Sequence, residues 1–210
     1  AEVQLVEVIP VWTDNTFLKP VAKLANPFVK LQGLQHKFVV LYSGNLGFTH
    51  DIEAIVDLAA LIDHADIEFL IIGEGEKKAL LQQKITDLQL TNCRMLPYQK
   101  PEDLPFTLAA ADIAIVTLGK GASRLSVPSK TYNLMSVGAP LLCIAGQDSE
   151  LASLVARYRI GRCFGADQLA DMCSFVLEMV DHPEQLQELR SNSLKASLDF
   201  GVENAKRFIY

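Results

Sequence analysis

Short apolar runs alternate with longer amphipathic segments along this chain. From residue 38 onward, runs of mostly aliphatic residues recur at 38–42, 67–72, 93–96, 112–116, 140–145 and 160–164. Near-continuous aliphatic runs of this length are typical of strands that are buried on both faces of a sheet. The pattern therefore predicts about six strands in the interior of an α/β protein.

Helical periodicity marks the segments between these runs. Within residues 51–64, Ile52, Ile55 and Ile62 recur on one side of a helix. Comparable patterns cover residues 77–88, 101–111, 130–137 and 149–158. Strands that alternate with helices form βαβ units, and their right-handed crossovers build a doubly wound parallel sheet. We therefore predict a Rossmann-like α/β fold.

Both ends of the chain depart from this alternation. Helices are predicted at residues 166–180 and 183–198, with a short one at 201–210. Residues 7–10 are interpreted as the end of a strand, and residues 15–20 as a turn or linker. We divide the chain into a linker segment at 1–34, a Rossmann-like domain at 35–198 and a C-terminal helix at 199–210. That helix is expected to pack on the core or on a domain absent from this sequence.

Composition and charge narrow the function classes. Half of the 210 residues are hydrophobic and 21% are charged, which supports a sizeable core and excludes a solvated coil. The net charge of −6 disfavours binding to nucleic acid or to an anionic membrane surface, because both need a broad basic field. The four cysteines lack CxxC spacing, so we expect reduced thiols in a cytoplasmic protein and no metal site. No apolar run approaches the ~18 residues that a membrane-spanning helix requires.

Ligands of an open parallel sheet bind at the loops that follow the carboxyl ends of its strands. The loop after the first run contains Gly44 and Gly47, which fit either a tight turn or the close approach of a phosphate. The loop after the second run, residues 72–76, combines two glycines with two carboxylates and is interpreted as a tight turn. Tyr98 follows the third run between two prolines, where its ring either stacks on a base or sugar or packs on its neighbours.

The longest polar connection follows the fourth run, at residues 118–128. Its glycines, serines and basic residues suggest a lid over a ligand, and Ser129 after it is a natural N-cap for the next helix. Four basic residues fall on this edge of the predicted sheet: Lys100, Lys120, Arg124 and Lys130. Several cations at one edge favour a phosphate site over isolated surface lysines. The sequence contains no P-loop, HExxH or GxSxG motif.

The segment after the predicted lid has a familiar order. Residues 126–140 run Ser-Val-Pro-Ser-Lys-Thr-Tyr-Asn-Leu-Met-Ser-Val-Gly-Ala-Pro. This segment resembles the donor site of family-four glycosyltransferases of the GT-B fold. It is most similar to the branch with a Pro-Ser-Lys-x-Tyr motif, whose bacterial members build capsular and lipopolysaccharide sugars. Other segments resemble the family in the same order, at residues 9–14, 40–47, 69–75 and 109–116.

This resemblance implies the C-terminal, donor-binding half of a two-domain enzyme. Such an enzyme transfers a hexose from a UDP- or GDP-linked sugar to a saccharide or lipid-linked acceptor. The resemblance also implies retention of anomeric configuration, no obligatory cofactor or metal, and a cytoplasmic location. The acceptor-binding half is absent here and the chain does not begin with methionine, so we expect it to be part of a longer one. Peripheral membrane association is expected only through that missing half.

Together, loop position and resemblance assign the diphosphate to two segments. Gly44, Asn45, Leu46 and Gly47 would approach it through their backbone N–H groups. Ser129 and Lys130 would bond its oxygens, and Lys130 would be the catalytic residue. Its positive charge would stabilise the nucleoside diphosphate that departs as the glycosidic bond breaks.

The remaining roles concern the base, the ribose and the sugar. Tyr98 would lie beside the base and Asn133 would hold the ribose, while the sugar would be bordered by Ser126, Val127 and Pro128. This chain departs from the broader family at Leu125 and Asn133, where two glutamates are the rule. The second of these glutamates is the one expected to bond the ribose hydroxyls, and Asn133 stands in its place.

Two other functions remain open from the sequence. A sugar-nucleotide 2-epimerase shares this architecture, but its acid–base carboxylates and histidine have no placed counterpart here. A non-catalytic module would bind a partner through its helical tail, where the end of the chain is apolar. The residues concerned are Phe200, Phe208, Ile209 and Tyr210.

Overall fold

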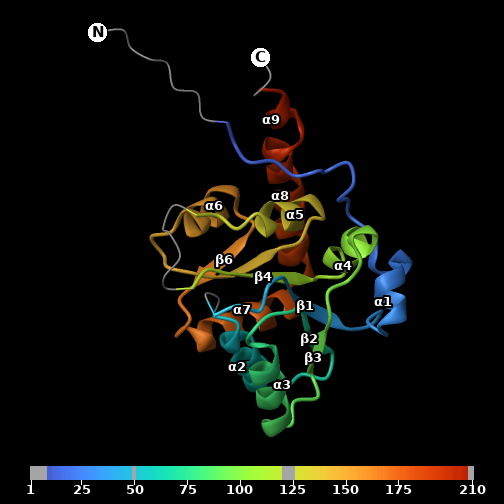
Figure 1. Ribbon diagram of the computed structural model, residues 1–210, viewed down its shortest axis with the longest axis vertical. Coiled ribbons are helices and arrows are strands. Elements are labelled where there is room, and N and C mark those ends of the chain that lie inside the picture. The colour runs from blue at the N-terminus through green and yellow to red at the C-terminus, as the bar shows by residue number, and fades with distance from the viewer. Residues whose placement is uncertain (1–8, 49–50, 120–125, 208–210) are drawn as a thin grey trace.

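One parallel sheet forms the centre of the molecule (Figure 1). The structure, a computed structural model, describes residues 9–48, 51–119 and 126–207. Within these ranges the strands are β1 (Phe38–Ser43), β2 (Ile67–Ile72), β3 (Cys93–Leu96), β4 (Ile113–Thr117), β5 (Leu141–Ile144) and β6 (Gly161–Phe164). They pair in the order β3-β2-β1-β4-β5-β6, and every pairing is parallel. The prediction of a doubly wound, six-stranded sheet is confirmed.

Helices cover both faces of this sheet (Figure 1). One face packs against α2 (Glu53–Leu61), α3 (Lys78–Asp87) and α7 (Leu169–Asp181). The other packs against α1 (Pro27–Leu31), α4 (Leu104–Leu108), α5 (Lys130–Ser136), α6 (Glu150–Tyr158) and α8 (Pro183–Ser197). A short helix, α9 (Glu203–Lys206), follows α8. None of the helices in the described ranges is both long and apolar enough to cross a membrane.

The central strands are buried from both sides, which explains their aliphatic sequence. In β1, Val39 and Leu41 join the core beneath α5 and α8, whereas Val40 and Tyr42 join the core beneath α2 and α7. Because successive side chains of a strand point to opposite faces, every position of such a strand meets a helix layer. A run without polar positions is therefore what this sheet requires.

The segment before β1 contains structure that the hydrophobic pattern does not predict. A 3-10 turn, η1 (Lys23–Ala25), precedes α1, and Phe28 and Val29 of α1 are buried in the core. The Asn26 side chain accepts hydrogen bonds from the amides of both residues, and Pro27 occupies the first helical position. Asparagine followed by proline is a helix-start signal, and α1 is too short for its periodicity to reveal it.

A buried carboxylate holds the start of β4 in place. Asp112 accepts hydrogen bonds from the Val39 amide at 2.8 Å and from the Arg190 guanidinium at 2.8 Å, and its second ion pair is with Lys23. These partners come from β1, α8 and η1, which are far apart in the sequence. Asp112 therefore ties together three elements at the end of the sheet opposite the carboxyl ends of the strands.

Candidate functional site

The strand order places a topological switch point between β1 and β4. From β1 the chain continues toward β2 and β3, while from β4 it continues toward β5 and β6 on the other side. In doubly wound sheets, ligands bind outside the carboxyl ends of the strands at such a point. The loop after β1 meets the side chain of the first residue of α5 at this position.

The turns after β1 and β2 interlock through their backbones. The Gly44 amide donates to the Ile72 carbonyl at 2.9 Å, and the Leu46 amide donates to the Glu74 carbonyl at 2.8 Å. The Leu46 carbonyl in turn accepts from the Lys77 amide at 2.9 Å. This arrangement holds the glycine loop after β1 in a defined conformation above the end of the sheet.

Substitution of Gly73 tests this interlock. A Cβ atom at Gly73 would overlap the Gly44 carbonyl oxygen, which is backbone and cannot rotate away. We expect Gly73→Ala to lower the free energy of unfolding by about 1–3 kcal/mol, because the turn after β1 has to shift. Urea denaturation measures this change. Gly47→Ala is the matched control, since its Cβ would meet the movable Asn45 side chain first, and equal stability of the two variants would contradict the prediction.

Lys130 extends from the first turn of α5 to the glycine loop. Its Nζ lies 4.3 Å from the centre of the Tyr42 ring and beside Gly44, where an added Cβ would overlap it. The Nζ atom is buried and has no hydrogen-bond partner among the described residues. Burial lowers the pKa of Lys130 to about 8. An ammonium group with this little solvation is poised to receive an anion.

Tyr42 forms the floor beneath this ammonium group. Its hydroxyl donates to the Asn45 carbonyl at 2.7 Å and is hydrogen-bonded to the Thr117 side chain at the end of β4. Burial raises the pKa of Tyr42 well above its usual value, and the Tyr98 hydroxyl nearby adds to the rise. The ring therefore stays neutral and presents its face to the cation.

The backbone amides of the glycine loop divide into two groups. Those of Gly44 and Leu46 are already bonded to the β2 turn, so in this conformation they are not available to a ligand. Those of Asn45 and Gly47 have no acceptor among the residues that the structure describes. The predicted diphosphate contacts through backbone N–H groups therefore narrow to Asn45 and Gly47.

Residues 126–129 lead directly into α5, which begins at Lys130. Ser129 is exposed and its backbone is already helical, so its hydroxyl makes no capping bond. The prediction of a Ser129 N-cap is wrong, because a capping side chain needs an extended backbone to reach the first free amides. Ser126 is exposed, Val127 and Pro128 are partly buried, and Val127 packs against the core.

Of the predicted basic residues, Lys130 is the one that reaches the glycine loop within the described ranges. Lys100 is exposed in the loop after β3. Lys120 and Arg124 fall outside the described residues, as do Leu125, most of the predicted lid and the apolar end at 208–210. Of the four cations that were predicted to gather at this edge, the described residues therefore place only Lys130 at the glycine loop.

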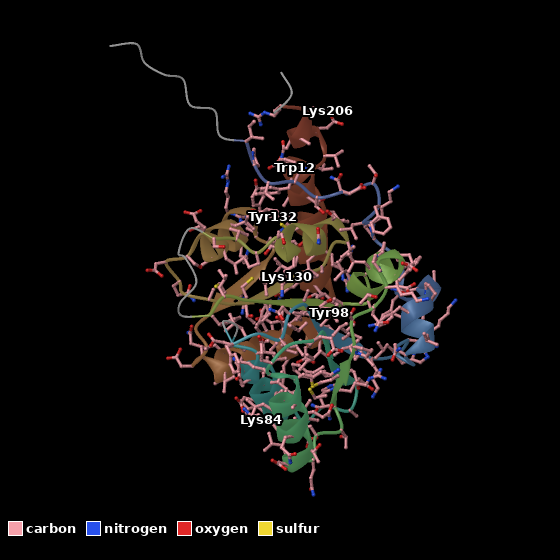
Figure 2. All side chains as sticks on the ribbon, in the orientation of Figure 1. Trp12, Lys84, Tyr98, Lys130, Tyr132 and Lys206 are labelled. Atoms are coloured by element: carbon pink, nitrogen blue, oxygen red, sulfur yellow. The ribbon has the colours of Figure 1, made fainter. Side chains whose placement is uncertain are left out.

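Tyr98 lies at the edge of this site. Tyr98 is 52% exposed, and its electrostatic contribution to the raised pKa of Tyr42 places it in the neighbourhood of that residue. In the view of Figure 2, Tyr132 and Trp12 lie farther than Tyr98 and Lys130 toward the end of the molecule where α9 is labelled. An exposed ring in this position is free to stack on a base.

Asn133 is held by a residue that sequence reasoning missed. The Thr13 hydroxyl donates to Oδ1 of Asn133 at 2.5 Å, across 120 positions of the chain. The Thr13 amide is itself bonded to the Phe200 carbonyl at 2.9 Å. No local signal predicts this contact, whereas the predicted spacing of Lys130 and Asn133 does place both on one side of α5.

The chemistry of the site is that of anion binding. It combines the buried cation at the start of α5 with two free amides and an exposed aromatic ring from loops that follow parallel strands. The described residues contain no group of three or more histidine, cysteine, aspartate or glutamate side chains suited to a metal ion. The arrangement fits a ligand with phosphate oxygens and an attached ring.

Comparison with known proteins decides the family. The sequence profile of the family described as "Glycosyl transferases group 1" matches residues 28–195, which is most of the chain. The chain belongs to the group 1 glycosyltransferases. Its resemblance to family-four enzymes is thereby confirmed.

Two curated relatives of this group 1 glycosyltransferase domain are bacterial. WbjE of Pseudomonas aeruginosa, described as a glycosyltransferase, is 28% identical over 150 residues, which cover 71% of this chain and 38% of that protein. WcaI of Escherichia coli K12, described as a colanic acid biosynthesis glycosyl transferase, is 31% identical over 119 residues, which cover 57% of this chain and 29% of that protein. The chain thus spans roughly a third of each relative.

Solved structures show that the fold is shared as well. Anabaena HepE in complex with UDP has a TM-score of 0.83 and 18% identity, covering 97% of this chain and 56% of that chain. HepE in complex with UDP-glucose has a TM-score of 0.80. The group 1 domain described here therefore has the Rossmann-like fold found in GT-B enzymes.

Proposed function

We propose that this domain binds the nucleotide-sugar donor of a glycosyltransferase at the carboxyl ends of β1 and β4. The observation that carries the proposal is the buried, unpartnered Nζ of Lys130 beside Gly44. A diphosphate oxygen placed there would accept from this ammonium and from the amides of Asn45 and Gly47. Charge-assisted hydrogen bonds of this kind are roughly twice as strong as neutral ones.

The other predicted residues fit around this anchor. Tyr98 would stack on the base and Asn133 would contact the ribose one helical turn after Lys130. Ser126, Val127, Pro128 and Ser129 would border the sugar and the outer phosphate oxygens. A UDP-linked hexose is the donor best supported, because HepE, which shares the fold, has been solved with UDP and with UDP-glucose.

Catalysis would consist of stabilising the leaving group. As the bond between the sugar and the diphosphate breaks, negative charge accumulates on the diphosphate oxygens. The Lys130 ammonium is fixed in place over Tyr42 before the reaction starts, so it lowers the barrier without reorganising. We identify no side chain in the described ranges that would act as a general base for the acceptor.

The acceptor would be bound by another part of a longer enzyme. The chain spans about half of HepE and roughly a third of WbjE and WcaI, which leaves room for a second domain in those proteins. By analogy with WcaI, the acceptor is a growing saccharide or its lipid-linked precursor. Retention of configuration, a cytoplasmic location and membrane contact through the acceptor half remain predictions from the resemblance. Among the residues that the structure describes, no feature of the site favours an epimerase or a non-catalytic module.

Titration calorimetry of the chain with UDP, UDP-glucose and GDP tests this proposal. We expect UDP and UDP-glucose to bind. Uridine, which lacks the diphosphate that Lys130 would bind, should release little or no heat. GDP would show whether the base is discriminated. A folded protein that binds none of these nucleotides at millimolar concentration would contradict the proposed function.

A further inference from the structure

The Thr13–Asn133 pair includes a residue of α5 that lies about one helical turn after Lys130, the anchor of the proposed donor site. Asn133 stands three positions after Lys130 on α5, so both side chains leave the same side of the helix. Thr13 comes from the segment before η1, and the residue is 7% exposed. The bond between the two residues is therefore largely protected from competition by water.

Thr13 is itself fixed in position from both sides. Its amide donates to the Phe200 carbonyl at 2.9 Å, and its carbonyl accepts from the Asn15 amide at 3.1 Å. The anchored backbone limits where the Thr13 hydroxyl can lie, and there the hydroxyl donates to Oδ1 of Asn133 at 2.5 Å.

This contact sets the polarity of Asn133 toward a ligand. A carboxamide has one oxygen that accepts and one NH2 group that donates. The bond from the Thr13 hydroxyl turns the oxygen side of the carboxamide toward Thr13, so the NH2 group faces away from Thr13, and it has no acceptor among the residues that the structure describes. A carboxylate in the same place would present only acceptors, which is the opposite polarity.

We propose that Thr13 is a positioning residue that turns the Asn133 carboxamide so that its NH2 group donates to an oxygen of the ligand. This inference rests on the proposed function, which places the ribose next to Asn133. A ribose hydroxyl oxygen then accepts the bond, and a deoxyribose at that position leaves the NH2 group unpaired. The Thr13–Asn133 pair therefore selects ribonucleotide donors over deoxyribonucleotide ones.

The test compares UDP with 2′-deoxy-UDP and 3′-deoxy-UDP on the wild type and on Thr13→Val, Thr13→Ser, Thr13→Ala and Asn133→Ala. We expect the wild type to bind UDP about three- to tenfold more tightly than one of the deoxy analogues, as for the loss of one neutral hydrogen bond. Thr13→Val keeps the shape of the side chain and removes its donor, so its ratio should fall to that of Asn133→Ala. Thr13→Ser keeps the hydroxyl and should retain the wild-type ratio.

A purely structural contact gives a different pattern. In that case Thr13→Val lowers the melting temperature but leaves the preference for UDP over both deoxy analogues unchanged, and this outcome overturns the inference. Equal affinity of the wild type for all three nucleotides also overturns it, while the proposed function survives. Absence of UDP binding to the folded wild type removes the proposed function and this inference with it. Thr13→Ala supplies the same ratio if Thr13→Val does not fold.

Discussion

Replacing Lys130 with methionine is expected to weaken UDP binding by about ten- to a hundredfold, because one or more charge-assisted hydrogen bonds of about 1.5–3 kcal/mol are lost. The same substitution is expected to stabilise the ligand-free protein. Burial lowers the pKa of Lys130 from its ordinary value of 10.5 to about 8, which corresponds to a cost of up to about 3 kcal/mol for the charged form. The contact with the Tyr42 ring offsets part of this cost, so we expect a net gain of about 1–2 kcal/mol.

The pH dependence of the two effects has opposite signs. Between pH 8 and 10.5 the unfolded chain binds a proton at Lys130 that the folded chain has released, so wild-type stability rises with pH in this window. The cost is fully present below pH 8, and the advantage of Lys130→Met is therefore largest there and shrinks toward pH 10.5. UDP affinity of the wild type instead falls as the pH rises through 8, because the ammonium form disappears.

Thermal melts and calorimetry at pH 7 and about pH 9.5 measure these changes together. Lys100→Met is the matched control, since Lys100 is an exposed lysine in a neighbouring loop. We expect its stability and UDP affinity to stay near those of the wild type. Unchanged UDP binding by Lys130→Met would show that Lys130 does not bind the diphosphate, and would contradict the proposed site.

Replacing Asp112 with alanine is expected to lower the free energy of unfolding by about 3–5 kcal/mol. Its side chain is 12% exposed, and the carboxylate interacts with the Val39 amide, Lys23 and Arg190 at once. The substitution leaves two partly buried cations and a buried amide without their acceptor, which costs far more than an exposed ion pair.

Urea denaturation of Asp112→Ala measures this loss. Glu203→Ala is the control, because the Glu203–Lys206 pair is mostly exposed and such pairs contribute about 0–1 kcal/mol. We expect UDP affinity to be retained by Asp112→Ala under conditions where the protein is folded, since Asp112 lies at the opposite end of the sheet from Lys130. A loss of less than 1 kcal/mol, like that of the control, would show that the three partners find other acceptors.

The sheet was predictable because its strands obey one simple constraint. Burial on both faces leaves no polar position in β2 other than Glu68, and the predicted limits of β2 and β3 agree with the structure. The short helices were less accessible. α1 was missed, and the predicted helix at 101–111 is a 3-10 turn followed by the five residues of α4.

The candidate site likewise has parts that the sequence predicts and parts that it does not. The sequence places Gly44 and Lys130 on one edge of the sheet because both follow buried strands, and the structure brings them into contact. The sequence does not predict which hydrogen-bond partner each polar group of the site has. The Leu46 amide is taken by a neighbouring turn, the Ser129 backbone is already helical, and Thr13 is folded back onto α5. These depend on tertiary structure and have no local signature.

The seam between β1 and β4 gives the proposed ligand a second effect. β1 pairs with β2 along its whole length, whereas it pairs with β4 at Val40 with Ile113 and at Leu41 with Ala114. A diphosphate bound by both the glycine loop and Lys130 would connect the two halves of the sheet across the strand pair with the fewest paired residues. The donor would then stabilise the domain in addition to being its substrate, and the ligand-free domain would separate first between β1 and β4.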